Sequence, residues 1–511
     1  MRKSAILLVL LLVLGIGGLI YTHVVLTAAQ YDVQYTEIAS FGDVSAANGL
    51  SVSVQTQLSQ RLVWNSTYTF EKEPVTQTDF AFSTERLPWR SPYTGGALAL
   101  SLVYDFSAST TGGSLLYDYG YEENVASMHG IASVDRILRD VASRTHNGER
   151  HTERVSLKDY YDYYPIGVDL RATRIRNNNY YYMNHMNEER YVSQIADERK
   201  IREAFNRYFL IPVSEEHRVT VEINKDSMGN VVAVSTSQES PAQLSSISVD
   251  TTRGIYFSLQ TGGLTDTSSI IYSGGGHGIH LLPASTIYDD EEDIELLTLD
   301  YENLSTVYFL EETVSVMRID LSEDESCLNL ITEEDGVLFL TVIEIATMAE
   351  KQKLSLLEFV DSNWIYTAIY AEGVLFVLLD DARFVLAQFD GDNTCKIVLS
   401  GLREHKLLNE ESFDRGYYRW NEPFISWNGE RLALIEATQR FVPDDDSDPD
   451  SRVGFSYGIS GFIVEVYNEK SELAYKGIYE SSLDALAADH NHNDDRCQLI
   501  DSGGLSLNWQ L

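Results

Sequence analysis

The sequence predicts a mainly β protein in three parts: an N-terminal transmembrane helix, a β-rich membrane-proximal α+β domain, and a β-propeller-like domain of about six or seven blades. Three observations predict this class. An uncharged apolar run opens the chain, mixed helices and strands give way to closely spaced short strands near residue 212, and a turn containing glycine recurs before apolar strands. A pair of β-sandwiches is the alternative architecture for the last part.

The N-terminal run has the length and the flanks of a membrane anchor. Residues 5–29 contain no Asp, Glu, Lys or Arg, and they exceed the ~20 residues needed to cross the hydrocarbon core of a bilayer. Arg2 and Lys3 precede the run and the next basic residue is Arg61, so residues 1–4 are expected in the cytoplasm and the rest of the chain outside it. A secretory signal cleaved near Ala29 is the alternative, but its apolar stretch would be only ~7–15 residues long.

The charge of the chain changes near residue 212. The formal net charge is −39; residues 211–511 hold 54 acidic and 18 basic residues, whereas residues 131–210 hold 12 acidic and 14 basic residues. This step predicts a boundary between a membrane-proximal domain, residues 30–212, and an acidic propeller-like domain, residues 213–511. Because an acidic surface repels phosphate groups, the chain is not expected to bind nucleic acid.

Two strands and two helices are predicted in the membrane-proximal domain. Apolar and polar residues alternate over Leu50–Leu58, and Ala97–Tyr104 is a second strand-like run. The first helix begins after Ser133 as its N-cap, and its apolar face is formed by Val134, Ile137, Leu138 and Val141. The second helix ends before Pro212, and its apolar face is formed by Ile201, Ala204, Phe205 and Tyr208.

Short strands follow one another from His217 onward. The first two, His217–Asn224 and Asn230–Ser237, flank a turn and predict a hairpin. Helices are nearly absent from the prediction here, and Ala346–Lys351 is expected to form a single helical turn. The other predicted strands are Gly254–Leu259, Ile294–Leu299, Ser305–Leu310, Thr313–Ile319, Gly336–Ile343, Leu354–Phe359, Trp364–Tyr370, Gly373–Leu379, Phe384–Phe389, Lys396–Leu399, Phe424–Trp427, Arg431–Ile435, Gly461–Tyr467 and Glu472–Tyr479.

A repeated turn favours the propeller-like architecture. Gly254, Gly336, Gly373 and Gly429 each precede an apolar run, at intervals of 82, 37 and 56 residues. Propeller blades repeat every ~40–50 residues, so the first interval corresponds to about two blades. Val374–Leu379 is apolar throughout, which is expected of a strand covered on both faces of its sheet.

The most aromatic stretch of the chain is a candidate ligand-binding site. Tyrosine rings offer flat apolar faces to the C–H groups of a sugar, and nearby guanidinium groups supply hydrogen-bond donors. The residues are Tyr160, Tyr161, Tyr163, Tyr164, Tyr180 and Tyr181, with Arg174 and Arg176. The alternative is that these tyrosines line the interior and the edge of a sheet.

The sequence specifies no cofactor, and a divalent cation is the one candidate. In an extended segment His490, His492 and Asp494 would project to the same side as ligands, although a polar loop has the same composition. The acidic segment 443–451 lacks the glycine of an EF-hand calcium loop, and the closing glutamate is absent at position 455. Ser273–His280 is expected to be a flexible turn, because no helix follows it as in a phosphate-binding loop.

Two catalytic motifs are missing from the sequence: neither His-Glu-x-x-His nor the lysine of a Walker motif occurs. We therefore expect a single-pass, membrane-anchored extracytoplasmic protein that binds or organises an envelope polymer or a protein partner. An envelope glycan hydrolase or lyase, with its acids gathered on the propeller scaffold, is the alternative. The three cysteines, Cys327, Cys395 and Cys497, allow at most one intrachain disulfide.

Overall fold

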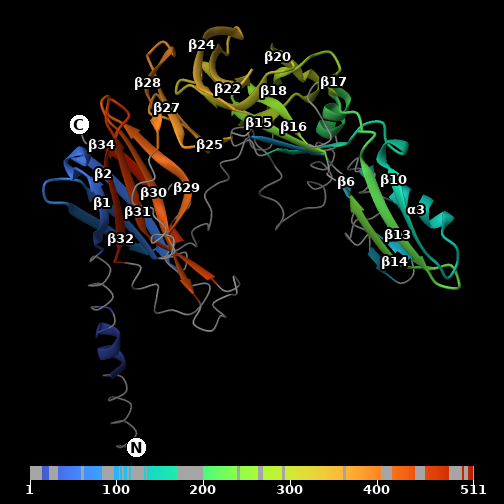
Figure 1. The fold of residues 1–511 in the computed structure, drawn as a ribbon, viewed down its shortest axis with the longest axis horizontal. Helices are drawn as coiled ribbons and strands as arrows, with labels where there is room; N and C mark the ends of the chain where they lie inside the picture. The colour runs from blue at the N-terminus through green and yellow to red at the C-terminus, as the bar shows by residue number, and fades with distance from the viewer. Residues whose placement is uncertain are drawn as a thin grey trace, which may run out of the picture. The chain divides into compact units, whose positions relative to one another are not determined.

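The computed structural model shows a mainly β chain (Figure 1), as the sequence predicts. It divides into two compact units: Met1–Thr94 and Ser362–Leu511 form the first unit, and Gly95–Asp361 form the second. The structure describes residues 14–21, 23, 33–58, 62–82, 97–102, 104–105, 109–111, 114–116, 132–133, 135–170, 200–238, 242–262, 269–289, 294–360, 364–403, 417–443, 455–482, 498–499 and 505–509.

The step of charge near residue 212 does not coincide with the division between these units. Residue 212 lies inside the second unit, and one hydrophobic core contains Phe205 and Phe209 before it and Val213 and Val219 after it. Charge is carried by exposed side chains, so the charge can change along a chain while the packing beneath is continuous.

Three antiparallel sheets build the first unit. One sheet contains β25 (Ile365–Ala371), β26 (Val374–Leu379), β27 (Arg383–Phe389) and β28 (Cys395–Leu402), in that order. The next has the order β1-β32-β31-β30-β29, with β1 (Tyr35–Gly42), β29 (Tyr417–Trp427), β30 (Leu432–Pro443), β31 (Phe455–Tyr467) and β32 (Leu473–Ser481). The third contains β2 (Leu50–Leu58), β3 (Leu62–Thr69) and β4 (Val75–Phe82), and β2 also pairs with β33 (Gln498–Leu499) and β34 (Leu505–Trp509).

The β29–β32 sheet is covered on both faces. One face packs against the β2–β4 sheet through a core that includes Phe462 and Tyr479, and the other packs against the β25–β28 sheet through Leu432 and Leu434. In the β25–β28 sheet, all six residues of β26 are buried, which confirms the expectation for Val374–Leu379. These sheets are therefore stacked in series, whereas a two-layered sandwich of antiparallel sheets commonly leaves an outer face to water.

Strands from the two ends of the chain pair with each other in the first unit. β1 pairs antiparallel with β32, with Tyr35 opposite Ser481, and β2 pairs antiparallel with β34, with Leu50 opposite Trp509. Both sheets therefore form only after the last part of the chain has been synthesised.

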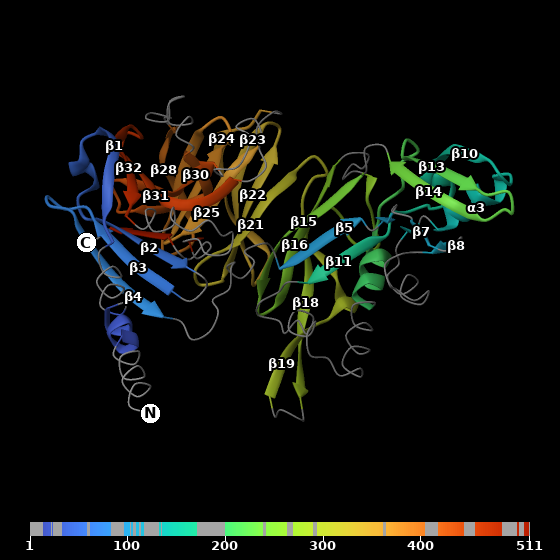
Figure 2. The same ribbon diagram turned by 90° about the horizontal axis from the view of Figure 1, so that it is seen from below.

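The second unit contains two larger sheets and several smaller ones. One of the larger sheets contains β21 (Ser315–Leu321), β22 (Cys327–Glu334), β23 (Val337–Glu344) and β24 (Ala349–Glu358). The other contains β15 (Gln243–Thr251), β16 (Gly254–Gly262), β18 (Gly278–Asp289) and β19 (Ile294–Leu299), and β20 (Ser305–Phe309) also pairs with β18. β18 continues past its pairing with β16 to form a two-stranded arm with β19 (Figure 2). The smaller sheets are formed by β10 (Arg150–Ser156), β13 (Arg218–Lys225) and β14 (Val231–Gln238), by β5 (Leu98–Leu102) and β11 (Ile166–Leu170), by β12 (Phe209–Leu210) and β17 (Ile271–Tyr272), by β6 (Tyr104–Asp105) and β9 (Ala132–Ser133), and by β7 (Ser109–Thr111) and β8 (Ser114–Leu116).

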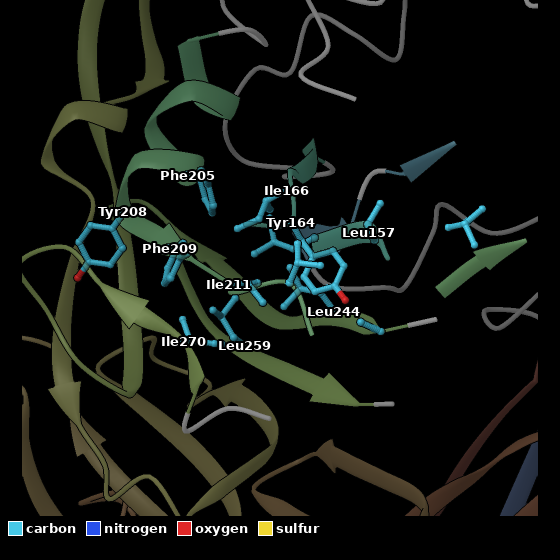
Figure 3. Packing of buried hydrophobic residues seen from close by; sticks show 14 of the residues in the cluster. Leu157, Tyr164, Ile166, Phe205, Tyr208, Phe209, Ile211, Leu244, Leu259 and Ile270 are labelled. Carbon is cyan, nitrogen blue, oxygen red and sulfur yellow. The ribbon is translucent and has the colours of Figure 1, made fainter. Parts of the chain in front are cut away.

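Both predicted helices contribute to the core of the second unit. α3 (Asp135–Arg144) buries the predicted residues Ile137, Leu138 and Val141. Residues 200–208 are helical, and the predicted apolar face is buried: Ile201, Ala204, Phe205 and Tyr208. Figure 3 shows the side chains of Phe205 and Phe209 beside those of Ile211, Leu259 and Ile270.

Three hairpins close with the same five-residue turn. The first residue is Asp226, Asp390 or Asn468, and its side-chain oxygen accepts hydrogen bonds from the amides two and four positions later, at 2.8–3.0 Å. The short polar side chain thus satisfies backbone donors inside the turn. The fourth residue adopts a positive φ in each case: Gly229 (90°), Asn393 (58°) and Ser471 (61°).

We expect Asn468→Ala to lower the free energy of unfolding of the first unit by about 1 kcal/mol, because the amides of Lys470 and Glu472 lose their acceptor. Urea denaturation followed by hydrogen exchange in β31 and β32 measures the change. Asn468→Asp keeps the acceptor but loses the amide that donates to Glu472 at 3.1 Å, so it should recover only part of the stability. Glu469→Ala controls for a change elsewhere in the turn. An equal loss in all three variants would contradict this role of the side chain.

Two shorter turns place glycines at the starts of apolar strands, as predicted. Asp335 and Gly336 join β22 to β23, and Glu372 and Gly373 join β25 to β26; all four residues have φ between 49° and 78°, which is typical of a type I′ hairpin. Gly336 lies between the second and third strands of its sheet, whereas Gly373 lies between the first and second strands of its own. The interval between the two glycines is therefore not the length of sequence that forms one sheet. The edge strands β21, β25 and β29 of three sheets instead begin 50 and 52 residues apart, close to the ~40–50-residue spacing of propeller blades.

Most predicted strands are confirmed, and the main errors have local causes. The hairpin after His217 is present as β13 and β14, and every other predicted strand overlaps an observed one. Ala346–Lys351 is not a helical turn, because β24 already begins at Ala349 and pairs with β23. The prediction missed β22, although all of its first six residues are buried.

The predicted anchor lies largely outside the described residues. Residues 14–21 within it are helical, and the structure, over the ranges it describes, contains no helix with the length and hydropathy needed to cross a membrane. Cys327 is a buried free thiol, and Cys395 is also buried. Cys497 and residues 444–451 of the acidic segment fall outside the described ranges.

Candidate functional site

The four described tyrosines of the predicted ligand site do not share one surface. Tyr164 is buried in the core with 2% of its surface exposed, whereas Tyr163 is 42% exposed. Tyr160 and Tyr161 are half-buried and pack against the same core. The alternative interpretation, tyrosines that line a core and its edge, therefore describes Tyr164 well, and Tyr163 is the ring most open to a ligand. The remaining predicted residues, Tyr180, Tyr181, Arg174 and Arg176, lie outside the described residues.

Tyr164 also belongs to a buried polar pair. Its hydroxyl lies 2.9 Å from Nδ1 of His217, which is fully buried, and it accepts a hydrogen bond from the amide of Ser214. A buried phenol needs such partners because an unpaired hydroxyl is costly in an apolar core. Tyr164 thus packs as a core residue in this structure, as the alternative interpretation of the aromatic stretch expects.

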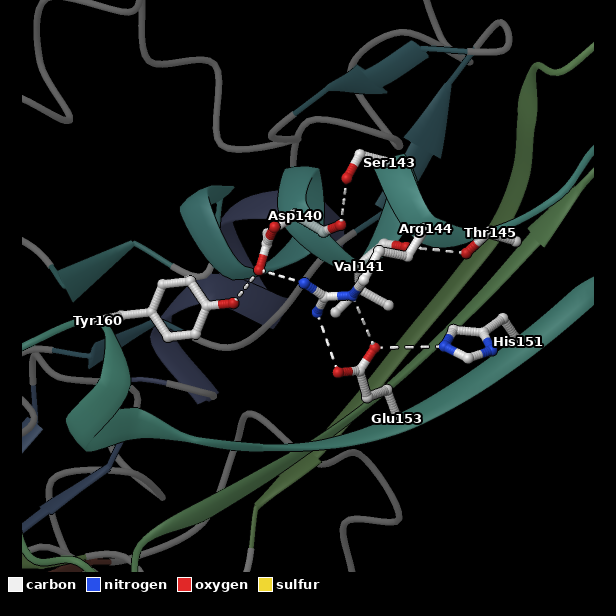
Figure 4. A network of polar contacts seen from close by, with 8 residues as sticks. All are labelled: Asp140, Val141, Ser143, Arg144, Thr145, His151, Glu153 and Tyr160. Carbon is white, nitrogen blue, oxygen red and sulfur yellow. Dashed lines mark hydrogen bonds and ion pairs between the residues drawn. The ribbon is translucent and has the colours of Figure 1, made fainter.

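Tyr160 enters a polar network at the end of α3 (Figure 4). Its hydroxyl donates to the carboxylate of Asp140, which also lies 2.7 Å from Nη1 of Arg144. The same guanidinium binds Glu153 through Nη2 at 3.0 Å and Nε at 3.2 Å, and His151 lies 3.2 Å from Glu153. Hydrogen bonding to Asp140 raises the pKa of Arg144, while burial, followed by the bond to Asp140, raises the pKa of Tyr160.

This network mainly fixes local structure. Arg144 lies in the last turn of α3, where a cation interacts favourably with the helix dipole, and it ties the helix to β10 through Glu153. Both carboxylates already share one guanidinium, so they offer little binding capacity to a ligand. Nothing in this geometry resembles an open carboxylate pair.

We expect Arg144→Ala to change the free energy of unfolding of the second unit by no more than about 1 kcal/mol, because its ion pairs are partly exposed to solvent. Leu138→Ala, nearly two turns earlier in α3 and 1% exposed, should lower the free energy of unfolding by about 2–5 kcal/mol through loss of core packing. Denaturation of the two variants side by side tests the difference. A loss of several kcal/mol in Arg144→Ala would show that the network is a major source of stability.

The histidines of Ser273–His280 are buried, which corrects the expectation of a flexible turn. His280 is 1% exposed and lies in β18, and its ring contacts four aromatic rings: Tyr208, Phe209, Phe257 and Tyr272. Burial, followed by repulsion from His277, lowers the pKa of His280 to about 3. The ring is therefore neutral at physiological pH.

A single hydroxyl organises the loop in front of this ring. Thr306 Oγ1 lies 3.2 Å from Nδ1 of His280 and 2.9 Å from the hydroxyl of Tyr208, and it donates to the carbonyl oxygen of Gly276 at 3.0 Å. A Cβ at Gly275 would collide with both hydroxyls, so the run of glycines permits this close approach. The other histidine, His277, donates through Nε2 to the carbonyl oxygen of Val314 at 2.8 Å.

The first unit contains a buried cluster of four charged side chains, which the sequence analysis missed. Arg403, at the end of the β25–β28 sheet, binds Glu436 through Nη1 at 2.8 Å and Glu465 through Nε at 2.7 Å. Lys476 lies 2.8 Å from the other oxygen of Glu465, and Tyr467 donates to Glu465 at 3.2 Å. Each of the four charged side chains is at most 2% exposed.

The cluster is neutral as a whole and connects two sheets. Glu436, Glu465 and Lys476 come from adjacent strands of the β29–β32 sheet, and Glu465 lies opposite Lys476 in the register. Burial opposes the charge of Arg403, but attraction to Glu465 and Glu436 prevails and raises its pKa well above the ordinary value. The burial of these charges leaves one signal in the sequence. Side chains alternate between the two faces of a strand, and this alternation places the charged residues of β30, β31 and β32 on the same face as Leu434 and Tyr467.

The predicted metal ligands remain untested. His490, His492 and Asp494 lie outside the described residues, and among the residues that the structure does describe, no group of three or more His, Cys, Asp or Glu side chains is arranged to hold a metal ion.

Comparison with known proteins gives no family. No protein-family model and no curated protein matches the chain. Similar solved structures include a putative 6-phosphogluconolactonase from Bacteroides fragilis (10% identity, 52% of this chain and 72% of that chain, TM-score 0.25), the β-propeller domain of Cps50 (Swd1) from Myceliophteria thermophila (11%, 54% and 94%, 0.21) and Hsv2 from Kluyveromyces lactis (9%, 48% and 82%, 0.21). The structural neighbours thus include β-propeller proteins, but similarities with such low TM-scores assign neither a site nor an activity.

Proposed function

We propose that the chain is an extracytoplasmic β-rich binding or scaffold protein, held to a membrane by residues 5–29. The observation that carries the proposal is the helix at residues 14–21. Its large apolar side chains, Leu14, Ile16, Leu19 and Ile20, are 50–73% exposed, although burying each would gain about 1.5–3 kcal/mol. A bilayer is the environment that removes these side chains from water, and the apolar sequence continues on both sides of them.

The described charged groups support binding or scaffolding more than catalysis. The two buried carboxylates, Glu436 and Glu465, both bind Arg403 inside the first unit, and Asp140 and Glu153 both bind Arg144. A glycan hydrolase needs two carboxyl groups that face the substrate across an open site. The described carboxylate pairs do not favour that alternative.

For the architecture we propose a propeller of about six or seven blades. Three features support it: the edge strands β21, β25 and β29 of three antiparallel sheets begin 50 and 52 residues apart, one sheet is covered on both faces, and two sheets combine strands from the two ends of the chain. The last feature is what a ring of blades requires in order to close on itself.

The anchor is tested by membrane extraction and labelling of the full-length chain. We expect the protein to stay with the membrane pellet after alkaline carbonate treatment, and a cysteine at position 228, where Met228 is 80% exposed, to react with a membrane-impermeant maleimide in intact cells. A variant with Leu10→Arg and Leu12→Arg should leave the membrane. Release of the unaltered protein by carbonate, or labelling of position 228 only after lysis, would contradict the proposed topology.

Ligand binding is tested at the most exposed described tyrosine of the candidate site. We expect soluble cell-wall oligosaccharides to raise the thermal unfolding temperature of the protein, since a ligand that binds the native state stabilises it. Tyr163→Ala should abolish this shift, whereas Tyr366→Ala, a 45% exposed tyrosine in the other unit, should retain it. The absence of any shift with the unaltered protein would remove these oligosaccharides as the proposed ligands.

A further inference from the structure

The edge of the first unit that follows the anchor carries exposed apolar side chains. This edge, which we call the β1 edge, consists of β1 and of the 3-10 helix η1 (Val44–Ala47) that follows it. Ile38, Phe41 and Val44 are 39%, 36% and 47% exposed. β1 is the outermost strand of its sheet, so these side chains lie at the border of the unit.

Local backbone geometry directs two of these side chains outward. The pairing of β1 with β32 shifts between Glu37 and Ala39, so Ile38 lies at a β-bulge, where the extra residue projects away from the regular ladder. At the start of η1, the Asp43 side chain accepts a hydrogen bond from the amide of Ser45 at 2.9 Å. This cap fixes the turn at which Val44 leaves the sheet.

The segment that forms this edge contains few charged residues for a very acidic protein, although Arg431 donates to the carbonyl oxygen of Ala46 in η1 at 2.8 Å. Residues 33–58 contain two acidic residues, Glu37 and Asp43, and no basic residue. Glu37 accepts hydrogen bonds from Tyr475 at 2.8 Å and Tyr479 at 3.1 Å. Burial alone would raise its pKa, but the bonds from Ser40 and the two tyrosines hold the pKa below its ordinary value. Glu37 is itself exposed, and these two hydroxyls of β32 hold its carboxylate in place.

The chain length keeps this edge close to the proposed anchor. Five residues, 30–34, separate the end of the apolar run from β1, and an extended chain spans at most ~3.6 Å per residue. Six backbone steps lead from residue 29 to residue 35, so the first residue of β1 lies within about 22 Å of the end of the anchor.

We propose that the β1 edge is the lipid-facing surface of the folded part, with Ile38, Phe41 and Val44 in contact with the interfacial region of the bilayer. The inference rests on the proposed anchor and adds an orientation to it. Exposed apolar side chains lose contact with water when they enter the interfacial region of a bilayer, which is favourable. Because this segment contains few acidic residues, an anionic lipid surface repels it less than it repels the acidic segments of the chain. Three contacts along one strand and its following turn require the strand to lie along the membrane surface.

Fluorescence quenching in lipid nanodiscs tests the proposal with the full-length chain. Single cysteines are introduced as Ile38→Cys and Val44→Cys, with Val75→Cys and Leu402→Cys as controls that are 42% and 56% exposed in the same unit. All four variants carry Cys497→Ser, and Cys327 and Cys395 are buried. Each introduced cysteine is labelled with an environment-sensitive fluorophore in nanodiscs of phosphatidylcholine and phosphatidylglycerol.

We expect doxyl groups near the lipid headgroups to quench the labels at positions 38 and 44 about twofold or more relative to the controls, as for side chains at ~5–10 Å depth, and aqueous iodide to quench mainly the controls. Iodide quenching at all four positions in protein that stays in the nanodisc would overturn the orientation and leave the anchor intact. Shielding of positions 38 and 44 from both quenchers would also overturn it, in favour of a protein partner at this edge. Loss of the protein from the nanodisc would instead refute the anchor.

A second pair of labelled variants keeps the proposal testable if Ile38→Cys or Val44→Cys fails to fold. Thr36→Cys and Ser45→Cys place labels on the same edge at exposed polar positions, where the side-chain change is small. Each labelled variant must retain the thermal unfolding transition of the unaltered protein. Iodide quenching of this second pair equal to that of the controls would overturn the proposal independently of the first pair.

Discussion

Arg403→Met is expected to lower the free energy of unfolding of the first unit by about 3–5 kcal/mol. The substitution leaves Glu436 and Glu465 buried with only Lys476 to balance them, so one negative charge is uncompensated in a site from which water is excluded. Hydrogen exchange of the β30 and β31 amides in the full chain, measured as a function of urea, reports this unit separately from the other.

Two controls distinguish the buried charge from the loss of an arginine. Arg383→Met breaks a partly exposed ion pair with Asp381 in the same sheet as Arg403, and should cost no more than about 1 kcal/mol. The combination of Arg403→Met and Glu436→Gln restores charge balance with Glu465 and Lys476, and should recover part of the loss. A small effect of Arg403→Met alone would show that water solvates the cluster.

The stability of the second unit is expected to fall by up to ~1.4 kcal/mol for each pH unit below 6.5, owing to His280. Its pKa is lowered to about 3 in the folded chain, whereas the unfolded chain has the ordinary value near 6.5. Between these values the unfolded state binds the additional proton, so stability is fully present above pH 6.5 and is lost as the pH falls toward 3. Urea denaturation at a series of pH values measures the slope.

His280→Phe should flatten this dependence, because phenylalanine fills the aromatic site without a titratable group. Thr306 keeps its bonds to Tyr208 and Gly276 in this variant. Titrating carboxylates contribute their own acid sensitivity, so the difference between the two proteins is the informative quantity. His151→Gln removes a partly exposed histidine of the same unit and controls for the loss of a histidine as such. An equal slope in His280→Phe would contradict the assignment.

The helices and many strands were predictable because the residues they bury recur at regular intervals in the sequence. The faces of α3 and of the helix at 200–208 follow the spacing of Ile137, Val141, Ile201 and Phe205, and all four are buried. β26 was recognised as a strand covered on both faces because each of its residues is apolar. Strand pairing over long distances, such as β1 with β32, leaves no comparable local signal.

The candidate sites were harder to predict, because the type of a residue does not indicate which side chains surround it in the fold. Tyr163 and Tyr164 are neighbours in the sequence, yet one is exposed and the other lies in the core. His280 is preceded by glycines that suggest a flexible turn, but four aromatic rings from three separate segments enclose it. Such environments are assembled from distant parts of the chain.

The sequence by itself determined the mainly β class, the two helices with their apolar faces, and the uneven distribution of charge, since each follows from composition or from a short period. Only the tertiary structure decided which strands share a sheet, that one core spans residue 212, and that Arg403, Glu436, Glu465 and Lys476 meet in a dry interior. The physical reason is that pairing and burial depend on side chains contributed from distant segments. Local preference fixes a strand, and packing then fixes its neighbours.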